Sequence, residues 1–178
     1  MALNVVLYQP EIPQNTGNIM RTCAGTDTVL HIIEPIGFKL DPKYIKRAGV
    51  NYLEHVVYHT YPNWEAFVKT NPGIYAFFTR YGKKTPSSFD FSLKEENYYL
   101  IFGRESTGIP KSILREHLDS CIRLPMNDKI RSLNLGNTVC TVLYEALRQQ
   151  DYRNLFKEEP ITLKGPDWII SDEEGNES

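Results

Sequence analysis

The sequence predicts an α/β protein: a mostly parallel sheet with helices on both of its faces. Two observations carry this prediction. Short segments rich in β-branched and aromatic residues alternate along the chain with segments of helical apolar periodicity. The first β-rich segment, residues 3–8, is nearly continuous in apolar character, which is typical of a strand buried on both faces.

The first strand leads directly into the first helix. Prolines in the following turn end the strand, because proline cannot donate to a sheet ladder. Asn15 or Thr16 can cap a helix that runs to about Gly25. We expect this helix to place Ile19 and Cys23 in the core.

Further strands and helices follow in the same alternation. The strands are predicted at residues 29–33, 56–58, 74–78, 98–102 and 121–124. The helices are predicted shortly after Pro42, where the segment is basic, and at residues 64–69, 110–117 and 135–149. The last helix carries a continuous apolar stripe, so we expect it to pack against the sheet.

The chain is expected to form one domain, residues 1–156, followed by an acidic tail, residues 157–178. A length of 178 residues with 41% hydrophobic residues suits a single core. The tail has a net charge of −5 and the whole chain −2, so the first 156 residues carry +3. We expect the apolar segment 168–170 to dock on the domain and residues 171–178 to be disordered.

The composition argues against several classes of protein. The chain has no apolar run of about 18 residues and no basic leader, so we expect a cytoplasmic protein without a membrane partner. Cys23, Cys121 and Cys140 are too widely spaced for a disulfide framework and are expected to be reduced core residues. His55 and His59 lie in a strand-like segment without an intervening glutamate base, so no metal is expected.

Three short segments combine turn-forming residues with polar side chains: residues 15–21, 103–110 and 122–134. Each follows a predicted strand, and ligands of open parallel sheets bind at the carboxyl ends of the strands. Glycine and proline free backbone groups for a ligand, while a nearby Arg, Glu or Asn can orient a reacting group. Residues 79–82 follow another strand and make a fourth candidate wall. The sequence therefore predicts an active site at this edge.

Two common nucleotide-binding motifs fit poorly. Residues 103–108 match the first half of the phosphate-binding motif G-x-x-x-x-G-K-S/T, but Ile109 and Pro110 follow where the lysine should stand. Glu105 would also place a carboxylate inside an anion cradle. No G-x-G-x-x-G follows the first strand, where Gly17 stands nearly alone, which argues against an ordinary nicotinamide-binding fold.

Taken together and in this order, the loops resemble the SPOUT superfamily of RNA methyltransferases. The matches are N-x-G-x-x-x-R at Asn15, Gly17 and Arg21, G-x-E-x-x-G at Gly103, Glu105 and Gly108, and I-P-M…S-L-N at residues 124–126 and 132–134, with Leu124 in place of isoleucine. Residues 5–13 and 31–38 resemble one branch in particular, the minimal tRNA wobble-nucleotide 2'-O-methyltransferases, which lack an added RNA-binding domain. The similarity covers roughly residues 2–152.

The resemblance implies features that periodicity alone does not predict. They are a SPOUT fold with a deep trefoil knot near the C-terminus, an obligate homodimer, and the cofactor S-adenosylmethionine held in a bent form by the knotted loops. The implied cofactor contacts are Phe78, Thr79, Gly103, Leu124, Ser132 and Leu133. The first helix and the helix at 135–147 suggest a dimer interface, with packing in the core as the alternative for their apolar stripes.

The implied reaction is methyl transfer to the 2'-oxygen of the tRNA wobble nucleotide, cytidine or uridine. A hydroxyl is a poor nucleophile, so the site needs a base or a partner for the developing oxyanion. Arg21 is the implied catalytic residue, and because arginine does not readily accept a proton we expect it to hold a phosphate and stabilise the alkoxide. Glu105 can aim Arg21 through an ion pair. Asn134 can orient the ribose or Arg21, or simply cap the following helix.

The expected RNA contacts, to the tRNA anticodon stem-loop, are Asn15, Lys43, Lys46 and Arg47. Phosphate contacts need local cations rather than a basic protein. The alternatives are a helix cap for Asn15 and a solvated helix face for the three cations. Two other functions stay open at this point: an RNA-binding protein without catalysis on the same fold, and a SPOUT methyltransferase that acts on ribosomal RNA.

Overall fold

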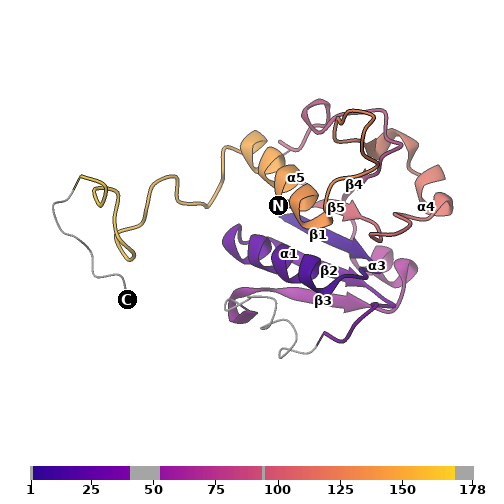
Figure 1. Ribbon diagram of the computed structural model, residues 1–178, viewed down its shortest axis with the longest axis horizontal. Coiled ribbons are helices and arrows are strands. Elements are labelled where there is room, and N and C mark those ends of the chain that lie inside the picture. Colours follow the sequence, from indigo (N-terminus) through magenta and orange to yellow (C-terminus); the bar gives the residue numbers. More distant parts are fainter. Residues whose placement is uncertain (1, 41–52, 94, 171–178) are drawn as a thin grey trace.

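A computed structural model describes residues 2–40, 53–93 and 95–170 (Figure 1). Its centre is a six-stranded parallel sheet in the order β3-β2-β1-β5-β4-β6. The strands are β1 (Leu3–Tyr8), β2 (Val29–Ile33), β3 (Tyr58–Tyr61), β4 (Ile74–Phe78), β5 (Tyr98–Phe102) and β6 (Cys121–Ile122). The predicted parallel α/β architecture is confirmed, although β3 starts two residues later than expected and β6 ends two residues earlier.

The helices follow the predicted alternation with the strands. They are α1 (Pro13–Gly25), α3 (Trp64–Thr70), α4 (Lys111–Arg115) and α5 (Leu135–Gln149), with short 3₁₀ turns at Leu53–His55, Pro86–Ser88 and Leu118–Ser120. The bounds of α5 agree with the prediction, because its apolar stripe is long and unbroken. The basic helix expected after Pro42 lies outside the described residues.

Helices cover both faces of the sheet, as the sequence predicts. Side chains of a strand alternate between the two faces, so Val5 packs in a core layer with α1 and α5 while Val6 packs in a second layer with α3 and α4. Helices α1 and α5 lie side by side over the first face (Figure 1). Cys23 is buried in that layer, and burial raises the pKa of its thiol to about 12. The three cysteines are free, and Cys23 and Cys121 are buried as expected, whereas Cys140 is only partly buried.

A buried polar network crosses the first strands of the sheet. The His31 side chain contacts Asn4 Oδ1 through Nε2 at 3.2 Å and the Tyr61 hydroxyl through Nδ1 at 2.9 Å. The Asn4 amide nitrogen donates to the Tyr98 carbonyl, which leaves its oxygen to accept from Nε2–H. Burial, with a smaller contribution from His59, lowers the pKa of His31 to about 4, so the ring is neutral near pH 7.

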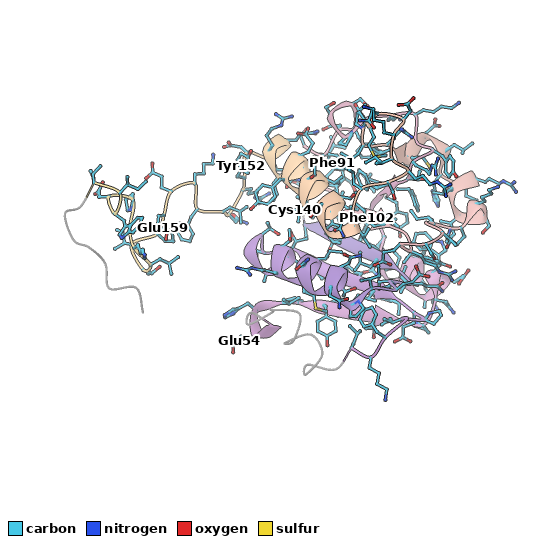
Figure 2. The ribbon with its side chains drawn as sticks, in the orientation of Figure 1. Glu54, Phe91, Phe102, Cys140, Tyr152 and Glu159 are labelled. Atoms are coloured by element: carbon cyan, nitrogen blue, oxygen red, sulfur yellow. The ribbon has the colours of Figure 1, made fainter. Side chains whose placement is uncertain are left out.

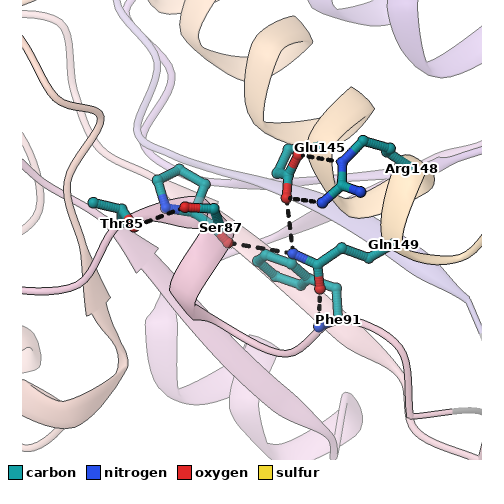
Figure 3. Close-up of polar contacts among 7 residues, drawn as sticks. Thr85, Ser87, Phe91, Glu145, Arg148 and Gln149 are labelled. Atoms are coloured by element: carbon teal, nitrogen blue, oxygen red, sulfur yellow. Dashed lines mark hydrogen bonds and ion pairs between the residues drawn. The ribbon is translucent and has the colours of Figure 1, made fainter.

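The long segment between β4 and β5 is fastened to the end of α5. Gln149 accepts a hydrogen bond from the Phe91 N–H at 2.9 Å and donates to the Pro86 carbonyl at 3.4 Å (Figure 3). Glu145 accepts from the same glutamine amide at 2.9 Å and also pairs with Arg148. The end of α5 therefore holds residues 86–91 of the segment that follows β4.

The chain beyond α5 leaves the domain. Tyr152 and Leu155 still pack on the core, but the following segment extends away and carries Glu159 far from the sheet (Figure 2). Ile169 and Ile170 are 86% and 79% exposed, so the predicted docking of residues 168–170 is wrong. Three apolar side chains do not offset the entropy lost by ordering the polar segment that precedes them. Residues 171–178 lie outside the described residues.

Two further expectations concern membranes and metals. Over the described ranges, no helix has both the length and the apolar character needed to span a bilayer. Within the same ranges, His, Cys, Asp and Glu side chains form no cluster of three that could hold a metal ion. The trefoil knot stays a prediction.

Candidate functional site

The carboxyl ends of β4, β5 and β6 open into a cavity of about 630 Å³. Its lining comes from the loops that follow these strands and from the starts of α1 and α5. All six residues expected to contact the cofactor lie on it: Phe78, Thr79, Gly103, Leu124, Ser132 and Leu133. Glu105, Asn134 and Asn15 line it as well. Residues of all four predicted segments line this one cavity: Asn15 of the first, 79–81 of the fourth, 103–109 of the second, and 122–124, Met126 and 131–134 of the third.

The Glu105 carboxylate binds the start of α1. It accepts hydrogen bonds from the backbone N–H of Glu11 at 2.9 Å and of Ile12 at 3.3 Å, and from Asn15 Nδ2 at 3.1 Å. Helix α1 begins at Pro13 and has no side-chain cap of its own. The prediction that Asn15 or Thr16 caps the helix is therefore wrong, because a carboxylate from a distant loop satisfies the amides next to the helix start.

Asn15 connects Glu105 to the start of α5. Its side chain is buried, donates to Glu105 and accepts a hydrogen bond from Asn134 Nδ2 at 2.9 Å. The Asn134 oxygen accepts from the Asn137 N–H at 3.2 Å and so caps α5. The three loop motifs thus meet in one chain of hydrogen bonds, and the capping role considered for Asn134 is present.

A second carboxylate strengthens the same junction. Glu11 accepts from the Ser106 N–H at 2.9 Å and from the Ser106 hydroxyl at 2.8 Å. These two hydrogen bonds, helped by the charge of Arg104, hold the pKa of Glu11 below its ordinary value. Arg104 in turn donates to Gln9 Oε1. Residues 9–12 and 104–106 are therefore joined by reciprocal side-chain contacts.

Gly103 is required where the cavity floor folds back on itself. A Cβ at this position would lie 2.2 Å from the Gly108 carbonyl carbon and 2.3 Å from the Ile109 nitrogen. The Arg104 and Gly108 backbones exchange hydrogen bonds of 3.3 and 2.9 Å, which closes the loop into a tight turn. Gly103 therefore lets two backbone segments of the loop lie close together, which is the role the sequence suggested for glycine in such loops.

Arginines dominate the charge of the cavity. Arg80, Arg104, Arg123 and Arg131 line it, whereas Glu105 is the only carboxylate among the described lining residues. Both oxygens of Glu105 already accept hydrogen bonds from the protein. The cavity therefore suits a ligand that carries anionic groups, such as phosphates or a carboxylate.

The remaining predicted residues lie elsewhere. Arg21 is exposed on α1, roughly 9 Å along the helix axis from Asn15 by the usual rise per residue, and does not line the cavity. Glu105 uses its oxygens for the start of α1 rather than for the expected ion pair with Arg21. Lys43, Lys46 and Arg47 lie outside the described residues. Direct RNA contact by Asn15 stays a prediction, and its amide is occupied within the protein.

Several lining residues were not predicted as site residues. Arg123 and Arg131 lie inside the third motif, and Arg104 lies inside the second, so their place in the sequence could have indicated them. Arg80 and Tyr81 belong to the fourth wall expected after β4. Ile12 and Thr138 had no such signal, because they enter through the packing of α1 and α5.

The chain matches a known protein family over most of its length. The family described as the SpoU rRNA methylase family matches residues 2–144. The chain belongs to this family. The resemblance to SPOUT methyltransferases is thereby confirmed.

Individual relatives extend the match over most of the chain. A protein of Bacillus subtilis is 52% identical over 157 residues, which are 87% of this chain and 98% of its own, and its name provisionally assigns tRNA (cytidine(34)-2'-O)-methyltransferase activity. A Saccharophagus degradans protein named tRNA (cytidine(34)-2'-O)-methyltransferase is 45% identical over 82% of this chain and 94% of its own. A solved structure concerned with the 2-OH methylation of C/U34 on tRNA is 38% identical, with a TM-score of 0.78, and covers 85% of this chain and 98% of that one.

Proposed function

We propose that this protein transfers the methyl group of S-adenosylmethionine to the 2'-oxygen of the tRNA wobble nucleotide, cytidine or uridine at position 34. The observation that carries the proposal is the meeting of the three loop motifs in one arginine-lined cavity. The relatives that bear this activity in their names match over more than four fifths of the chain, which supports the same substrate.

The cavity fits the cofactor in size and in chemistry. About 630 Å³ lies within the range of small-molecule sites. Phe78 and Leu133 offer apolar surface for a purine ring, and Thr79, Gly103, Leu124 and Ser132 would hold it through backbone and hydroxyl groups. When bound, S-adenosylmethionine supplies an electrophilic methyl group on its sulfonium sulfur.

Glu105, Asn15 and Asn134 act in this proposal by positioning. Their polar atoms bind one another and the starts of α1 and α5, so they fix the loops that bear the cofactor contacts. A displacement of about 1 Å at a reacting centre can cost a large share of the rate. Glu105 and Asn134 therefore belong to the active centre as supports of its geometry.

Arg21 is assigned to the nucleic-acid side of the reaction. Since it lies outside the cavity of its own chain, we propose that a homodimer brings Arg21 of one copy to the cavity of the other. Helices α1 and α5 share one face of the sheet and would form the interface. The guanidinium would hold a phosphate and stabilise the developing alkoxide, because its charge is permanent and its donors are fixed.

The second candidate is methylation of ribosomal RNA. The description of the matching family names rRNA, which favours this alternative. The named relatives at 45% and 52% identity point instead to tRNA and match this chain across nearly their full length. We therefore place tRNA first.

A map of ribose methylation tests the proposal. Total tRNA and rRNA from cells with and without the gene would be digested and analysed by mass spectrometry. We expect loss of the 2'-O-methyl mark at position 34 alone, with restoration by the wild-type gene. Loss of a mark in rRNA with tRNA unchanged would establish the second candidate instead.

The purified Arg21→Ala variant tests the assignment of Arg21. We expect turnover on tRNA to fall at least about 100-fold, as for other groups that stabilise developing charge, while the Kd for S-adenosylmethionine measured by calorimetry stays the same. An equal loss of both would place Arg21 among the cofactor contacts.

A further inference from the structure

We propose that Arg80 and Tyr81 form a stacking platform for an unpaired nucleobase of the RNA substrate at the mouth of the cavity. The inference rests on the proposed function and deepens it, because it names the residues that recognise the anticodon loop. We call this pair the Arg80–Tyr81 platform.

The exposure of Tyr81 is the first observation. Tyr81 is 73% exposed, which is the largest exposed fraction among the large hydrophobic residues described before residue 156. It lies on the lining of the cavity, next to the predicted cofactor contact Thr79. The Arg80 guanidinium carbon lies 5.3 Å from the centroid of the ring. An aromatic ring and an arginine plane held together in solvent are the two side-chain surfaces on which unpaired bases stack.

The backbone that carries the platform is fixed. A Cβ at Gly82 would lie 2.4 Å from the carbonyl carbon of Ile122, so the loop rests directly on the end of β6. Arg123 donates its backbone N–H to the Lys84 carbonyl at 2.8 Å, and its guanidinium donates to the Arg80 carbonyl. Beyond the loop, the contacts of Gln149 hold Pro86 and Phe91 (Figure 3). Because the loop is already ordered, stacking on it costs little conformational entropy.

The charge around the platform favours nucleic acid over a protein partner. Arg80, Arg123 and Arg131 line the same cavity. Lys83 and Lys84 continue the loop and are exposed. Phosphates on either side of a stacked base would meet these cations, whereas an apolar protein surface would leave them desolvated.

The position of the platform indicates which base it takes. The ribose that receives the methyl group must reach the cavity, so its neighbours in the anticodon loop pass over the mouth, where Tyr81 lies. Stacking with any base is possible because every base presents a π-face. The platform therefore holds a nucleotide next to the methylated one and contributes affinity for the loop without strict sequence preference.

The test compares Tyr81→Ala with Tyr81→Phe, which retains the ring, and with Leu118→Ala. Leu118 is 69% exposed and does not line the cavity. A fluorescein-labelled anticodon stem-loop measures RNA affinity by anisotropy, calorimetry measures the Kd for S-adenosylmethionine, and CD melting checks the fold. We expect Tyr81→Ala to weaken stem-loop binding and kcat/KM by roughly 5- to 150-fold, the range for loss of one stacked base. The Kd for S-adenosylmethionine should stay within about twofold, Tyr81→Phe should recover RNA binding, and Leu118→Ala should resemble the wild type.

Other outcomes would overturn the inference in distinguishable ways. Equal RNA affinity of the wild type and Tyr81→Ala defeats the platform and leaves the proposed function standing. A parallel loss of cofactor affinity would make Tyr81 a wall of the cofactor site, and a change of oligomeric state in sedimentation would make it a protein contact. A wild-type protein that neither binds nor methylates any tRNA would defeat the proposed function and the platform together.

Discussion

The two sides of the cavity use their polar side chains in opposite ways. We define the closed wall as residues 9–15 with 103–108. Its polar side chains bind other groups of the protein, and Glu105 and Glu11 together accept five hydrogen bonds. The open wall, residues 79–82 with 130–133, holds its backbone in place but leaves Tyr81 and Leu133 73% and 42% exposed. The carboxylates of the closed wall therefore fix geometry, while the side chains of the open wall are available to ligands.

The largest difference between the walls should appear in stability, with Gly103→Ala. Its new Cβ would lie 2.2 Å from backbone that cannot move without opening the closed wall. We expect a loss of about 3 kcal/mol in the free energy of unfolding, or roughly 6–12 °C in Tm. Thermal CD measures this. Gly25→Ala, where a Cβ meets nothing within 4 Å, is the control and should change stability by less than about 1 kcal/mol.

Glu105→Gln removes the negative charge of one closed-wall side chain and keeps its shape. Glu105 accepts hydrogen bonds from three N–H groups, and at least one of them would then face the side-chain NH₂ of the new glutamine. We expect unfolding in urea to show a loss of about 1–3 kcal/mol, with reduced methylation. Glu116→Gln changes an exposed glutamate and should stay within about 0.5 kcal/mol. A Glu105→Gln variant as stable as the wild type would contradict the structural role of the closed wall.

Acid should weaken the closed wall through Glu11. Hydrogen bonds from Ser106 lower its folded-state pKa, so its contribution is present above the unfolded value of 4.5 and is lost as the pH falls below it. The pKa of His31, lowered to about 4 from 6.5, makes stability fall from pH 6.5 towards 4 in every variant. Urea midpoints between pH 7 and 3 should therefore decline more steeply below pH 4.5 in the wild type than in Glu11→Gln. Parallel curves would show that the Glu11 contact adds nothing.

The smallest stability effect is expected on the open wall, with Leu133→Ala. Its side chain is 42% exposed and loses little burial on truncation, so Tm should change by no more than about 2 °C. Cofactor affinity should fall about tenfold, because a bound purine would lose roughly two methylene contacts. Calorimetry measures the Kd. A large drop in Tm with unchanged affinity would reverse the comparison of the two walls.

The sequence predicted the edge of the sheet that carries the cavity more accurately than it predicted the hydrogen-bond partners of individual side chains. The strand-end loops could be found because turn residues and polar side chains mark them locally. The six positions expected to contact the cofactor came instead from the resemblance to the family, and all six line the cavity. The Glu105 cap of α1 joins residues 90 to 94 positions apart. No local pattern reports such a pairing, so the sequence favoured a cap from within the helix.

The sequence alone determined the strand and helix alternation, the parallel sheet, the bounds of α5 and the family, since periodicity and ordered motifs are local properties. Only the tertiary structure decided that Asn15 lies between Glu105 and Asn134, that Arg21 lies outside its own cavity, and that residues 168–170 stay away from the core. The physical reason is that hydrogen bonds and burial depend on which distant segments meet, and the fold of the whole chain sets those meetings.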